Sequence, residues 1–366
     1  MKKALILGAT GVMGQPLVRL LSASGEWQVS ATSRRARSDA AVRWIRGDGH
    51  DIAFLRELLS QTRYDCVADF LNYGTESFRE RYELFLNNVG HYIFLSSARV
   101  YAPHDGLIDE TSPRLLDVSR DADYLRTDPY ELAKAREENL LNDSRAKNYT
   151  IIRPSLTYGS HRMQFTLFEM EEWLYRVLDG NSVIFPEDMA EIRTTMTRGE
   201  DVARLISRLA LNEKAFGETF NINGGGSLTW GEILRVYVRA IQAERRTPVK
   251  VCAVADAGKL ARELGRYSQY RYARGIHRTF SNQKIAAVVG EADCVPITEG
   301  LTQAVRQFLR SGDRPERYRD FRTVAKLDRI AGERTALRRF DSVKHKIAYF
   351  ATIWGGGTAI KRRILP

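Results

Sequence analysis

Residues 1–14 read MKKALILGATGVMG, and this stretch decides the fold class. An apolar run, Ala4–Leu7, passes directly into glycine, a pattern typical of a strand buried on both faces of a parallel sheet. Residues 12–25 then have helical apolar spacing. A tight turn between a strand and a helix lets backbone N–H groups approach a pyrophosphate. The stretch therefore predicts a dinucleotide-binding turn, formed by Gly8, Thr10, Gly11, Val12, Met13 and Gly14.

The alternation of strand and helix patterns continues along the first part of the chain. Apolar runs predict further buried strands at residues 27–33, 42–48, 65–71, 91–97 and 149–156. Helical spacing predicts helices at residues 52–61, 77–88 and 130–143. Strands that alternate with helices form βαβ units with right-handed crossovers. We therefore expect an α/β protein with a Rossmann doubly wound parallel sheet.

The pattern changes after Gly159, where helical stretches dominate. We expect helices at residues 164–180, 200–212, 229–242 and 297–312, and a strand near 219–224 that returns to the first sheet. A length of 366 residues indicates about two domains. We predict a Rossmann core at 1–160, a mainly substrate-binding lobe at 161–310 and a basic C-terminal extension at 311–366.

The charge distribution and the residue composition of the chain limit which partners and which cellular compartment we expect. Residues 310–366 hold 15 Lys/Arg against 6 Asp/Glu, so +9 of the net charge of +11 lies there. No apolar run approaches the roughly 18 residues of a membrane span. The start of the chain runs into a glycine turn instead of a cleavage site, so we expect no signal peptide. Three widely separated cysteines indicate reduced thiols and a cytoplasmic protein, and the scattered histidines indicate no metal site.

The end of the second expected strand bears on the choice of cofactor. An NAD site commonly places an acidic residue there to hold the ribose 2′-hydroxyl. Here Ser33, Arg34 and Arg35 occupy that place, and the first carboxylate after them is Asp39. A guanidinium matches a 2′-phosphate, so we expect NADP in preference to NAD, unless these are two solvated arginines. Asp48 either lies beside the adenine or caps the helix that follows it.

A tyrosine and a lysine lie one helical turn apart in TDPYELAKAREENLL, residues 127–141. Because residues i and i+4 share a helix face, the Lys134 ammonium can favour the Tyr130 phenolate and make it a general acid or base. A packed tyrosine beside a solvent-facing lysine would give the same spacing. Ser97 ends a strand at the edge where ligands bind, and its hydroxyl can polarise a carbonyl. Pro154 ends the next strand, where a rigid turn would shape the nicotinamide pocket.

These motifs together resemble those of a known superfamily. GATGVMG (8–14), SSARVY (96–101), Tyr130-x-x-x-Lys134 and IIRPSLTYG (151–159) are similar to the extended short-chain dehydrogenase/reductase superfamily, in its NAD(P)-dependent nucleotide-sugar epimerase, dehydratase and reductase branch. The resemblance covers about residues 1–310. DCVADFLNY (65–73) and TWGEIL (229–234) look most like a subgroup of the branch that also resembles chloroplast stem-loop-binding proteins.

The resemblance implies roles by position. Tyr130 would be the catalytic acid/base, and Lys134 would also hold the nicotinamide ribose. Ser97 would bind the reacting oxygen, so that Ser97 and Tyr130 both contact the substrate. The three glycines of the turn would cradle the pyrophosphate. The resemblance further implies a nucleotide-sugar substrate and a homodimer.

Several positions depart from the pattern of that branch. Its 4,6-dehydratases carry an acidic pair where Ala98 and Arg99 stand here, so we do not expect dehydration. Its fourth strand ends in small residues, whereas Asn72 and Tyr73 stand here, beside the expected nicotinamide.

An arginine of the branch often grips the substrate diphosphate. Arg193 and Arg198 lie near that place without aligning cleanly, and Arg274 is a third candidate. Each of the three would serve equally well as a surface residue.

Three functions fit these residues. The first is an NADP-dependent 4-keto reductase acting on a nucleotide-activated sugar. The second is a nucleotide-sugar 4-epimerase with tightly bound NAD. The third is an RNA-binding protein on a retained cofactor fold, against which the intact Ser97, Tyr130 and Lys134 argue.

The basic C-terminal residues 311–366 have no counterpart in the resemblance. We favour docking of YFATIW (349–354) onto the body or a second subunit. Contact with an anionic membrane surface is the next reading, in which the protein would be peripheral to the inner membrane. In that reading the apolar side chains that contact the membrane are Tyr349, Phe350, Ile353 and Trp354, and the positive charge comes from Lys361–Arg363. Nucleic acid is the least favoured partner.

Overall fold

The structure is a computed structural model, and it describes residues 1–290, 292–314, 316–355 and 362–365. The chain forms two compact units. The first comprises residues 1–157, 195–226 and 279–295, and the second comprises residues 158–194, 227–278 and 296–366. The chain therefore leaves the first unit and returns to it twice.

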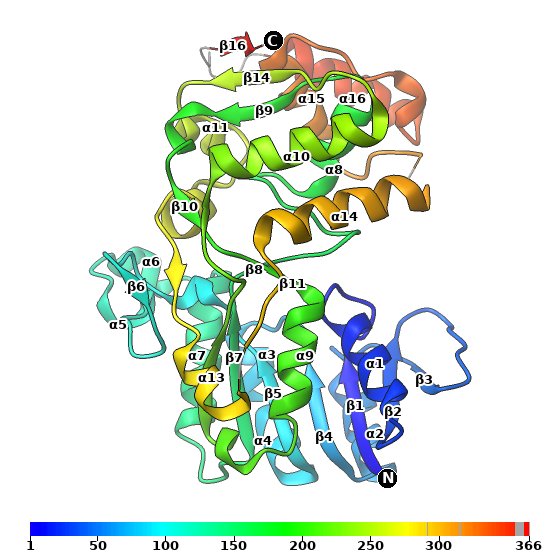
Figure 1. Cartoon of the computed structure of the whole chain (residues 1–366), viewed down its shortest axis with the longest axis vertical. Helices are drawn as coiled ribbons and strands as arrows, with labels where there is room; N and C mark the ends of the chain where they lie inside the picture. The colour runs from blue at the N-terminus through cyan, green and yellow to red at the C-terminus, as the bar shows by residue number, and fades with distance from the viewer. Residues whose placement is uncertain (291, 315, 356–361, 366) are drawn as a thin grey trace. The chain divides into compact units, whose positions relative to one another are not determined.

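A seven-stranded sheet forms the centre of the first unit (Figure 1). Its order is β12-β7-β5-β4-β1-β2-β3, and all its strand pairs are parallel, which confirms the expected Rossmann doubly wound sheet. The strands are β1 (Lys2–Leu7), β2 (Trp27–Ser33), β3 (Val42–Arg46), β4 (Tyr64–Asp69), β5 (Val89–Leu95), β7 (Tyr149–Pro154) and β12 (Glu218–Ile222).

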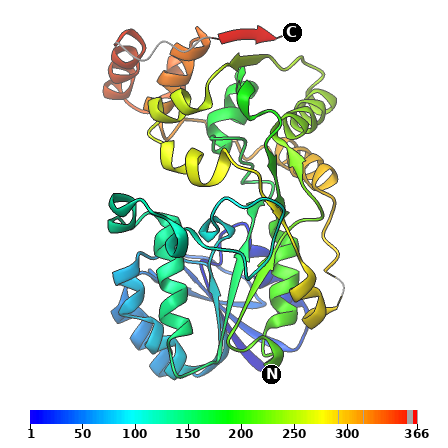
Figure 2. The same ribbon diagram turned by 90° about the vertical axis from the view of Figure 1, so that its left-hand side faces the viewer.

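Helices cover both faces of this sheet. The longer ones are α1 (Gly14–Ala23), α2 (Ile52–Gln61), α4 (Tyr82–Asn88), α7 (Tyr130–Asn142), α9 (Gly199–Leu209) and α13 (Gln283–Val289). One apolar cluster packs α1, α9 and α13 against the sheet, and a second packs α2, α4 and α7 against the other face. Figure 2 shows α9 and α13 on one side of the sheet and α7 on the other. The shorter elements are α3 (Thr75–Arg79), η1 (Ala98–Val100), β6 (Leu107–Ile108), α5 (Leu115–Val118), α6 (Ala122–Arg126), β8 (Leu156–Tyr158), β11 (Met196–Arg198), η3 (Glu213–Ala215) and β15 (Thr279–Phe280).

The expected helix at 77–88 is wrong in its continuity, because two helices, α3 and α4, occupy this stretch. They separate at Arg81, whose Nε donates to the Ser77 carbonyl at 2.6 Å and whose guanidinium lies 4.5 Å from the Tyr73 ring centroid. The side chain of Arg81 thus takes over a carbonyl at the end of the first helix.

The second unit is built around a three-stranded sheet of order β16-β14-β9, with β9 parallel and β16 antiparallel to β14. Its strands are β9 (Val183–Pro186), β14 (Val251–Val254) and β16 (Arg362–Leu365), with a separate pair β10 (Arg193–Thr194) and β13 (Leu228–Thr229). Its helices are α8 (Met170–Leu178), η2 (Glu187–Met189), α10 (Trp230–Arg245), α11 (Ala257–Glu263), α12 (Tyr267–Gln269), η4 (Tyr270–Arg274), α14 (Ile297–Ser311), α15 (Phe321–Ala331), η5 (Leu337–Arg339) and α16 (Val343–Trp354).

Two helix starts in this unit follow from local chemistry. α10 begins after Thr229, as expected, because Thr229 and Glu232 form a reciprocal capping box. The expected helix at 164–180 is wrong in its first turn, since α8 begins at Met170. Phe165 and Phe168 exchange backbone hydrogen bonds across a tight turn, and Thr166 has a φ of 46°, which no α-helix accommodates.

The C-terminal residues dock onto the second unit. Arg176 of α8 is fully buried and pairs with Asp328 and Glu333, and Tyr318 donates to Asp179 at 2.7 Å. The expected docking of residues 349–354 onto the body is confirmed for Tyr349 and Ile353, which are buried, and the Tyr349 hydroxyl donates to Asp328 of α15. Lys361, one of the cations expected to contact a membrane, lies outside the described residues. None of the helices within the described ranges is long and apolar enough to cross a membrane.

Candidate functional site

The glycine turn lies between β1 and α1, and each glycine meets a different requirement. Gly8 has a φ of 71°, in the left-handed region that favours glycine. A Cβ at Gly14 would stand 2.6 Å from the Gly8 carbonyl oxygen, so Gly14 permits the helix to pack against the turn. Gly11 is exposed and donates its N–H to the Gly8 oxygen at 3.1 Å. The turn thus has the three features that a pyrophosphate cradle needs.

The other residues of the turn divide between surface and core. Thr10 is exposed and Val12 is half-buried, whereas Met13 is buried in the apolar cluster that also contains α9. The turn therefore leaves Thr10 and Gly11 exposed and is anchored through Met13.

Ser33, Arg34 and Arg35 lie at the carboxyl end of β2, as the sequence indicates. Both arginines are exposed, and the Ser33 hydroxyl accepts the Arg35 backbone N–H at 3.2 Å. Asp48 is also exposed and accepts the His50 N–H at 3.0 Å. The alternative that Asp48 caps α2 is wrong, because Asp51 accepts the N–H groups at the start of that helix.

Ser97 and Tyr130 lie on adjoining elements. Ser97 follows β5 and caps η1, where its hydroxyl accepts the Arg99 N–H at 3.2 Å. The Arg99 guanidinium lies 4.9 Å from the Tyr130 ring centroid and pairs with the buried Glu131 of α7. This bridge joins the turn after β5 to the start of α7, where Tyr130 is the first residue. Arg99 therefore fixes the relative position of Ser97 and Tyr130.

Lys134 lies in a buried ionic cluster. Its ammonium is 2.9 Å from Glu137, with exposed side-chain fractions of 1% and 0%, and 4.6 Å from the Phe94 ring centroid. Burial raises the pKa of Glu137 to about 7, although the charge of Lys134 opposes the shift. One carboxylate oxygen of Glu137 is buried without a hydrogen-bond partner among the described residues. Lys134 is thus held by a carboxylate that is costly to ionise.

Asp69 is a second buried carboxylate, at the end of β4. It accepts hydrogen bonds from the hydroxyls of Tyr92 at 2.9 Å and Tyr73 at 3.1 Å. Burial raises the pKa of Asp69, and the positive charge of Lys134 opposes that shift. Tyr73 is consequently packed in the core beneath the sheet edge, whereas its neighbour Asn72 is exposed. Asn72 is therefore the exposed side chain of this pair.

A second buried network supports the neighbouring strand ends. Glu138, fully buried on α7, accepts from Arg153 at 2.7 Å and from Ser96 at 2.5 Å. Arg153 also donates to the Tyr101 hydroxyl at 2.8 Å. The positive charges of Arg153 and Arg114 hold the pKa of Glu138 below its usual value, although burial alone would raise it. The network fixes the end of β7, where the buried Pro154 lies.

The three candidate diphosphate-binding arginines have different surroundings. Arg198 lies in the first unit and pairs with Glu200 at 3.2 Å. Arg193 lies in the second unit and is exposed. Arg274 belongs to the same unit, but it is buried and donates to Gln164 at 3.0 Å. Of the three, Arg193 is the one with an exposed side chain.

A sequence profile described as the NAD dependent epimerase/dehydratase family matches residues 4–223, which include the glycine turn and parts of all seven strands of the central sheet. The chain belongs to this family. The resemblance drawn from the sequence motifs is therefore confirmed at the level of family.

Curated relatives match the chain at modest identity. The chloroplast stem-loop binding protein of 41 kDa b from Arabidopsis thaliana is 28% identical over 65% of this chain and 63% of that protein. A UDP-glucose 4-epimerase from Lacticaseibacillus casei is 28% identical over 37% of this chain and 45% of that protein. The chain spans less than two thirds of the length of these relatives.

Solved structures show the same fold. The dTDP-glucose 4,6-dehydratase of Bacillus anthracis, in complex with NAD, aligns with a TM-score of 0.66 at 14% identity, over 86% of this chain and 98% of that one. The UDP-glucuronic acid 4-epimerase of Bacillus cereus, in complex with UDP-glucuronic acid and NAD, gives 0.63 at 16%, over 84% and 99%. At these identities the likeness supports the fold alone.

Three site residues were not singled out from the sequence. Glu137 carried a usable signal, since it lies three residues after Lys134 on the same helix face. Asp69 carried a weaker one, a carboxylate at the end of an apolar strand. Glu131 carried none, because its burial depends on Arg99 from another element.

Proposed function

We propose that the chain is an NAD(P)-dependent oxidoreductase acting on a nucleotide-activated sugar, in the first place a 4-keto reductase. The observation that carries this proposal is the linkage of Ser97, Tyr130 and Lys134 around the carboxyl ends of β4 and β5. In open parallel sheets this edge binds the ligand. The glycine turn follows the carboxyl end of β1, and β1 pairs in parallel with β4, so the turn lies at this same edge of the sheet.

The residues divide the chemistry among themselves. A bound nicotinamide cofactor supplies hydride transfer to the sugar carbonyl carbon. Ser97 accepts the Arg99 N–H, so its own hydroxyl hydrogen is directed elsewhere and can donate to the carbonyl oxygen. Tyr130 gives its phenolic proton to the same oxygen as negative charge develops there. Lys134, one helical turn after Tyr130 on α7, supports that proton transfer with its positive charge.

NADP is the proposed cofactor, in preference to NAD. Arg34 and Arg35 are exposed directly after β2, where a 2′-phosphate needs positive charge. The Arg34→Ala, Arg35→Ala double variant should weaken NADPH binding by at least tenfold and change NADH binding by less than about twofold. The Arg19→Ala, Arg56→Ala variant removes the same charge from two exposed helix positions and serves as the control. Equal affinity of the wild type for both cofactors would contradict the preference.

A nucleotide-sugar 4-epimerase with retained NAD is the second candidate. The similarity to a UDP-glucose 4-epimerase supports it, because the same acid/base residue would act in both directions within one cycle. Identification of the nucleotide in freshly purified protein separates the candidates. Tightly held NAD supports the epimerase, whereas an empty site that prefers NADPH supports the reductase.

Substitution of the acid/base tests the chemistry common to both candidates. Tyr130→Phe should lower turnover by about a hundredfold to ten-thousandfold while NADPH affinity stays within about twofold. Tyr82→Phe, at a tyrosine that pairs with Glu83 on α4, should leave turnover unchanged. Full activity of Tyr130→Phe would refute the assignment of the acid/base.

The similarity to a stem-loop binding protein makes RNA binding the remaining candidate. It predicts salt-sensitive binding to stem-loop RNA that Tyr130→Phe does not alter. We further propose that the protein acts in the cytoplasm as a homodimer, which sedimentation at graded concentrations would test.

A further inference from the structure

The outward face of α16 carries an apolar stripe. Val343, Ile347 and Trp354 have exposed fractions of 69%, 65% and 74%. With Phe350 they follow the spacing i, i+4, i+7, i+11, which places all four on one face of a helix. The Phe350 and Trp354 rings stack at a centroid distance of 5.1 Å. The stripe is therefore continuous along three turns.

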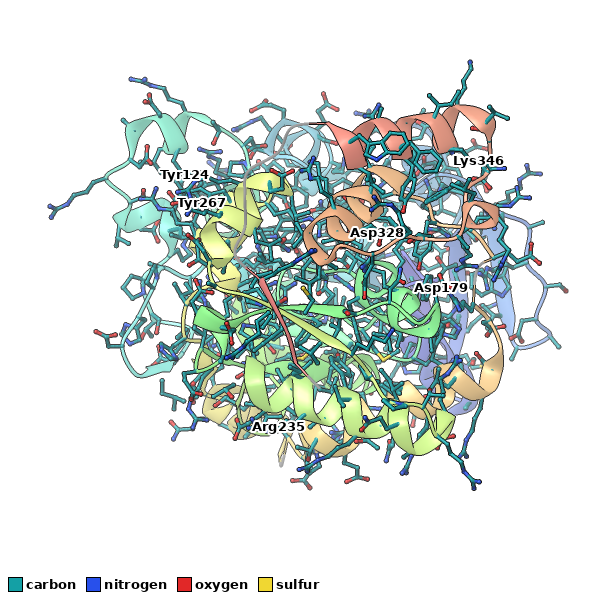
Figure 3. All side chains as sticks on the ribbon, turned by 90° about the horizontal axis from the view of Figure 1, so that it is seen from above. Tyr124, Asp179, Arg235, Tyr267, Asp328 and Lys346 are labelled. Carbon is teal, nitrogen blue, oxygen red and sulfur yellow. The ribbon has the colours of Figure 1, made fainter. Side chains whose placement is uncertain are left out.

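A neighbouring face of α16 is firmly attached to the second unit. Tyr349 and Ile353 are buried, and the Tyr349 hydroxyl donates to Asp328 of α15 at 2.5 Å. Arg329 caps the carboxyl end of α16 by donating to the Thr352 oxygen at 3.0 Å. Figure 3 shows Asp328 on α15 and Lys346 on the adjacent α16. The stripe is exposed although the helix that bears it is docked.

Positive charge flanks the stripe on both sides. At 3.6 residues per turn, Lys344 lies on one flank and Lys346 on the other. α16 contains no acidic residue, and neither lysine forms an ion pair within the described part of the chain. The turn before the helix adds the exposed Leu337 and Arg338.

We propose that this face of α16 binds the surface of an anionic lipid membrane, with the helix lying in the plane of the interface. An apolar stripe bordered by lysines and ended by tryptophan matches such a surface in both polarity and charge. A second copy fits less well, because packing α16 on α16 about a two-fold axis would bring like charges together. Nucleic acid fits less well too, because Val343 and Ile347 offer bases nothing to stack on.

Vesicle binding by the full chain tests this proposal. We expect co-sedimentation with vesicles of phosphatidylcholine and phosphatidylglycerol, little with phosphatidylcholine alone, and loss of binding as salt is raised. Trp354 is a built-in probe, since Trp27, Trp173 and Trp230 are buried and Trp44 is half-buried. Its fluorescence should shift to the blue with anionic vesicles.

Variants separate the stripe from its charges. Ile347→Ser should weaken binding severalfold, and Lys344→Glu with Lys346→Glu by at least tenfold, with melting temperatures unchanged because Ile347 and Lys344 are exposed and Lys346 is half-buried. Leu107→Ser and Val118→Ser, at the similarly exposed apolar positions of the first unit, should bind as the wild type does.

Three results would overturn the proposal. The full chain could ignore anionic vesicles. It could form dimers that Ile347→Ser dissolves, without binding vesicles. It could bind RNA through Lys344 and Lys346, with anionic vesicles failing to reduce that binding.

Discussion

At the scale of single residues, Glu137 sets the surroundings of Lys134. The pair is buried, and the pKa of Glu137 is raised to about 7, so its charge changes within the working range of pH. The charge of Lys134 also opposes the rise in the pKa of the buried Asp69, so two buried carboxyl groups interact with the ammonium. Glu137 is thus a positioning residue for Lys134.

A neutral replacement tests this role, which depends on the proposed function. Glu137→Gln should remove a transition near pH 7 from the pH–rate profile and lower turnover about tenfold above it, because Lys134 loses its nearest anion. Glu83→Gln, on the surface helix α4, is the charge-matched control. An unaltered profile would show that Glu137 serves packing alone.

His91 makes stability depend on pH. The Leu211 N–H donates to its Nδ1 at 3.0 Å, so Nδ1 carries no proton and Nε2 donates to Thr150 at 2.8 Å. Burial lowers the pKa of His91 to about 3 from an ordinary 6.5. Because the folded-state pKa is depressed, the stabilisation is complete above pH 6.5 and is lost as pH falls toward 3.

The expected loss can be measured by urea unfolding at pH 6.5 and pH 5. This interval should cost the wild type about 2 kcal/mol of unfolding free energy through His91 alone. His91→Gln should be less stable at neutral pH but should lack this part of the slope. His104→Gln, at an exposed histidine, should retain the wild-type slope. Equal slopes in all three proteins would refute the assignment.

At the scale of elements, the glycine turn separates folding from binding. A Cβ at Gly14 meets the Gly8 oxygen at 2.6 Å, whereas at Gly11 its nearest neighbour is at 3.4 Å. Gly14→Ala should therefore lower the unfolding free energy by about 1–3 kcal/mol. Gly11→Ala should leave stability within about 0.5 kcal/mol and weaken cofactor binding. Chemical unfolding and cofactor titration check the pair, and a Gly14→Ala protein as stable as the wild type would contradict the turn geometry.

The central sheet could be predicted from the sequence because its strands are apolar on both faces, as in Ala4–Leu7. Their alternation with helices then predicts a parallel sheet with right-handed crossovers. Tyr130, Lys134 and Ser97 could be named because spacing and strand ends are local properties. The break at Arg81 could not, because it depends on contacts with the Ser77 carbonyl and the Tyr73 ring.

The second unit was less predictable for a related reason. Its short strands, β9 and β14, have no alternating pattern and pair across about 65 residues of sequence. α16 reads as an apolar segment, and only its packing shows which side faces solvent. The alternative of a membrane contact was wrong in counting Tyr349 and Ile353 among its apolar residues, because both are buried, whereas Ile347 is exposed.

At the scale of the whole molecule, the basic C-terminal residues complete the second unit. Arg176, fully buried on α8, meets Asp328 and Glu333, and Glu333 also accepts from the Ser182 N–H at 2.9 Å. Arginines of this stretch also pair with the rest of the unit, since Arg314 and Arg339 pair with Asp179 and Arg329 pairs with Glu263. Without residues beyond Ser311, Arg176 would be left buried without its anions.

Loss of one of these anions gives the sharpest test of that dependence. Asp328→Ala leaves the Arg176 guanidinium buried beside a vacated site and removes the acceptor of the Tyr349 hydroxyl. Breaking a buried pair in this way costs about 3–5 kcal/mol, more than any surface pair contributes. Asp341→Ala is the control, since its pair with Arg317, at 3.0 Å, is half-exposed on both sides and its loss should cost less than about 1 kcal/mol. Equal melting temperatures for Asp328→Ala and Asp341→Ala would mean that the C-terminal residues are an appendage. A large gap between them, together with failure of a chain ended at Ser311 to fold, would make these residues part of the second unit's core.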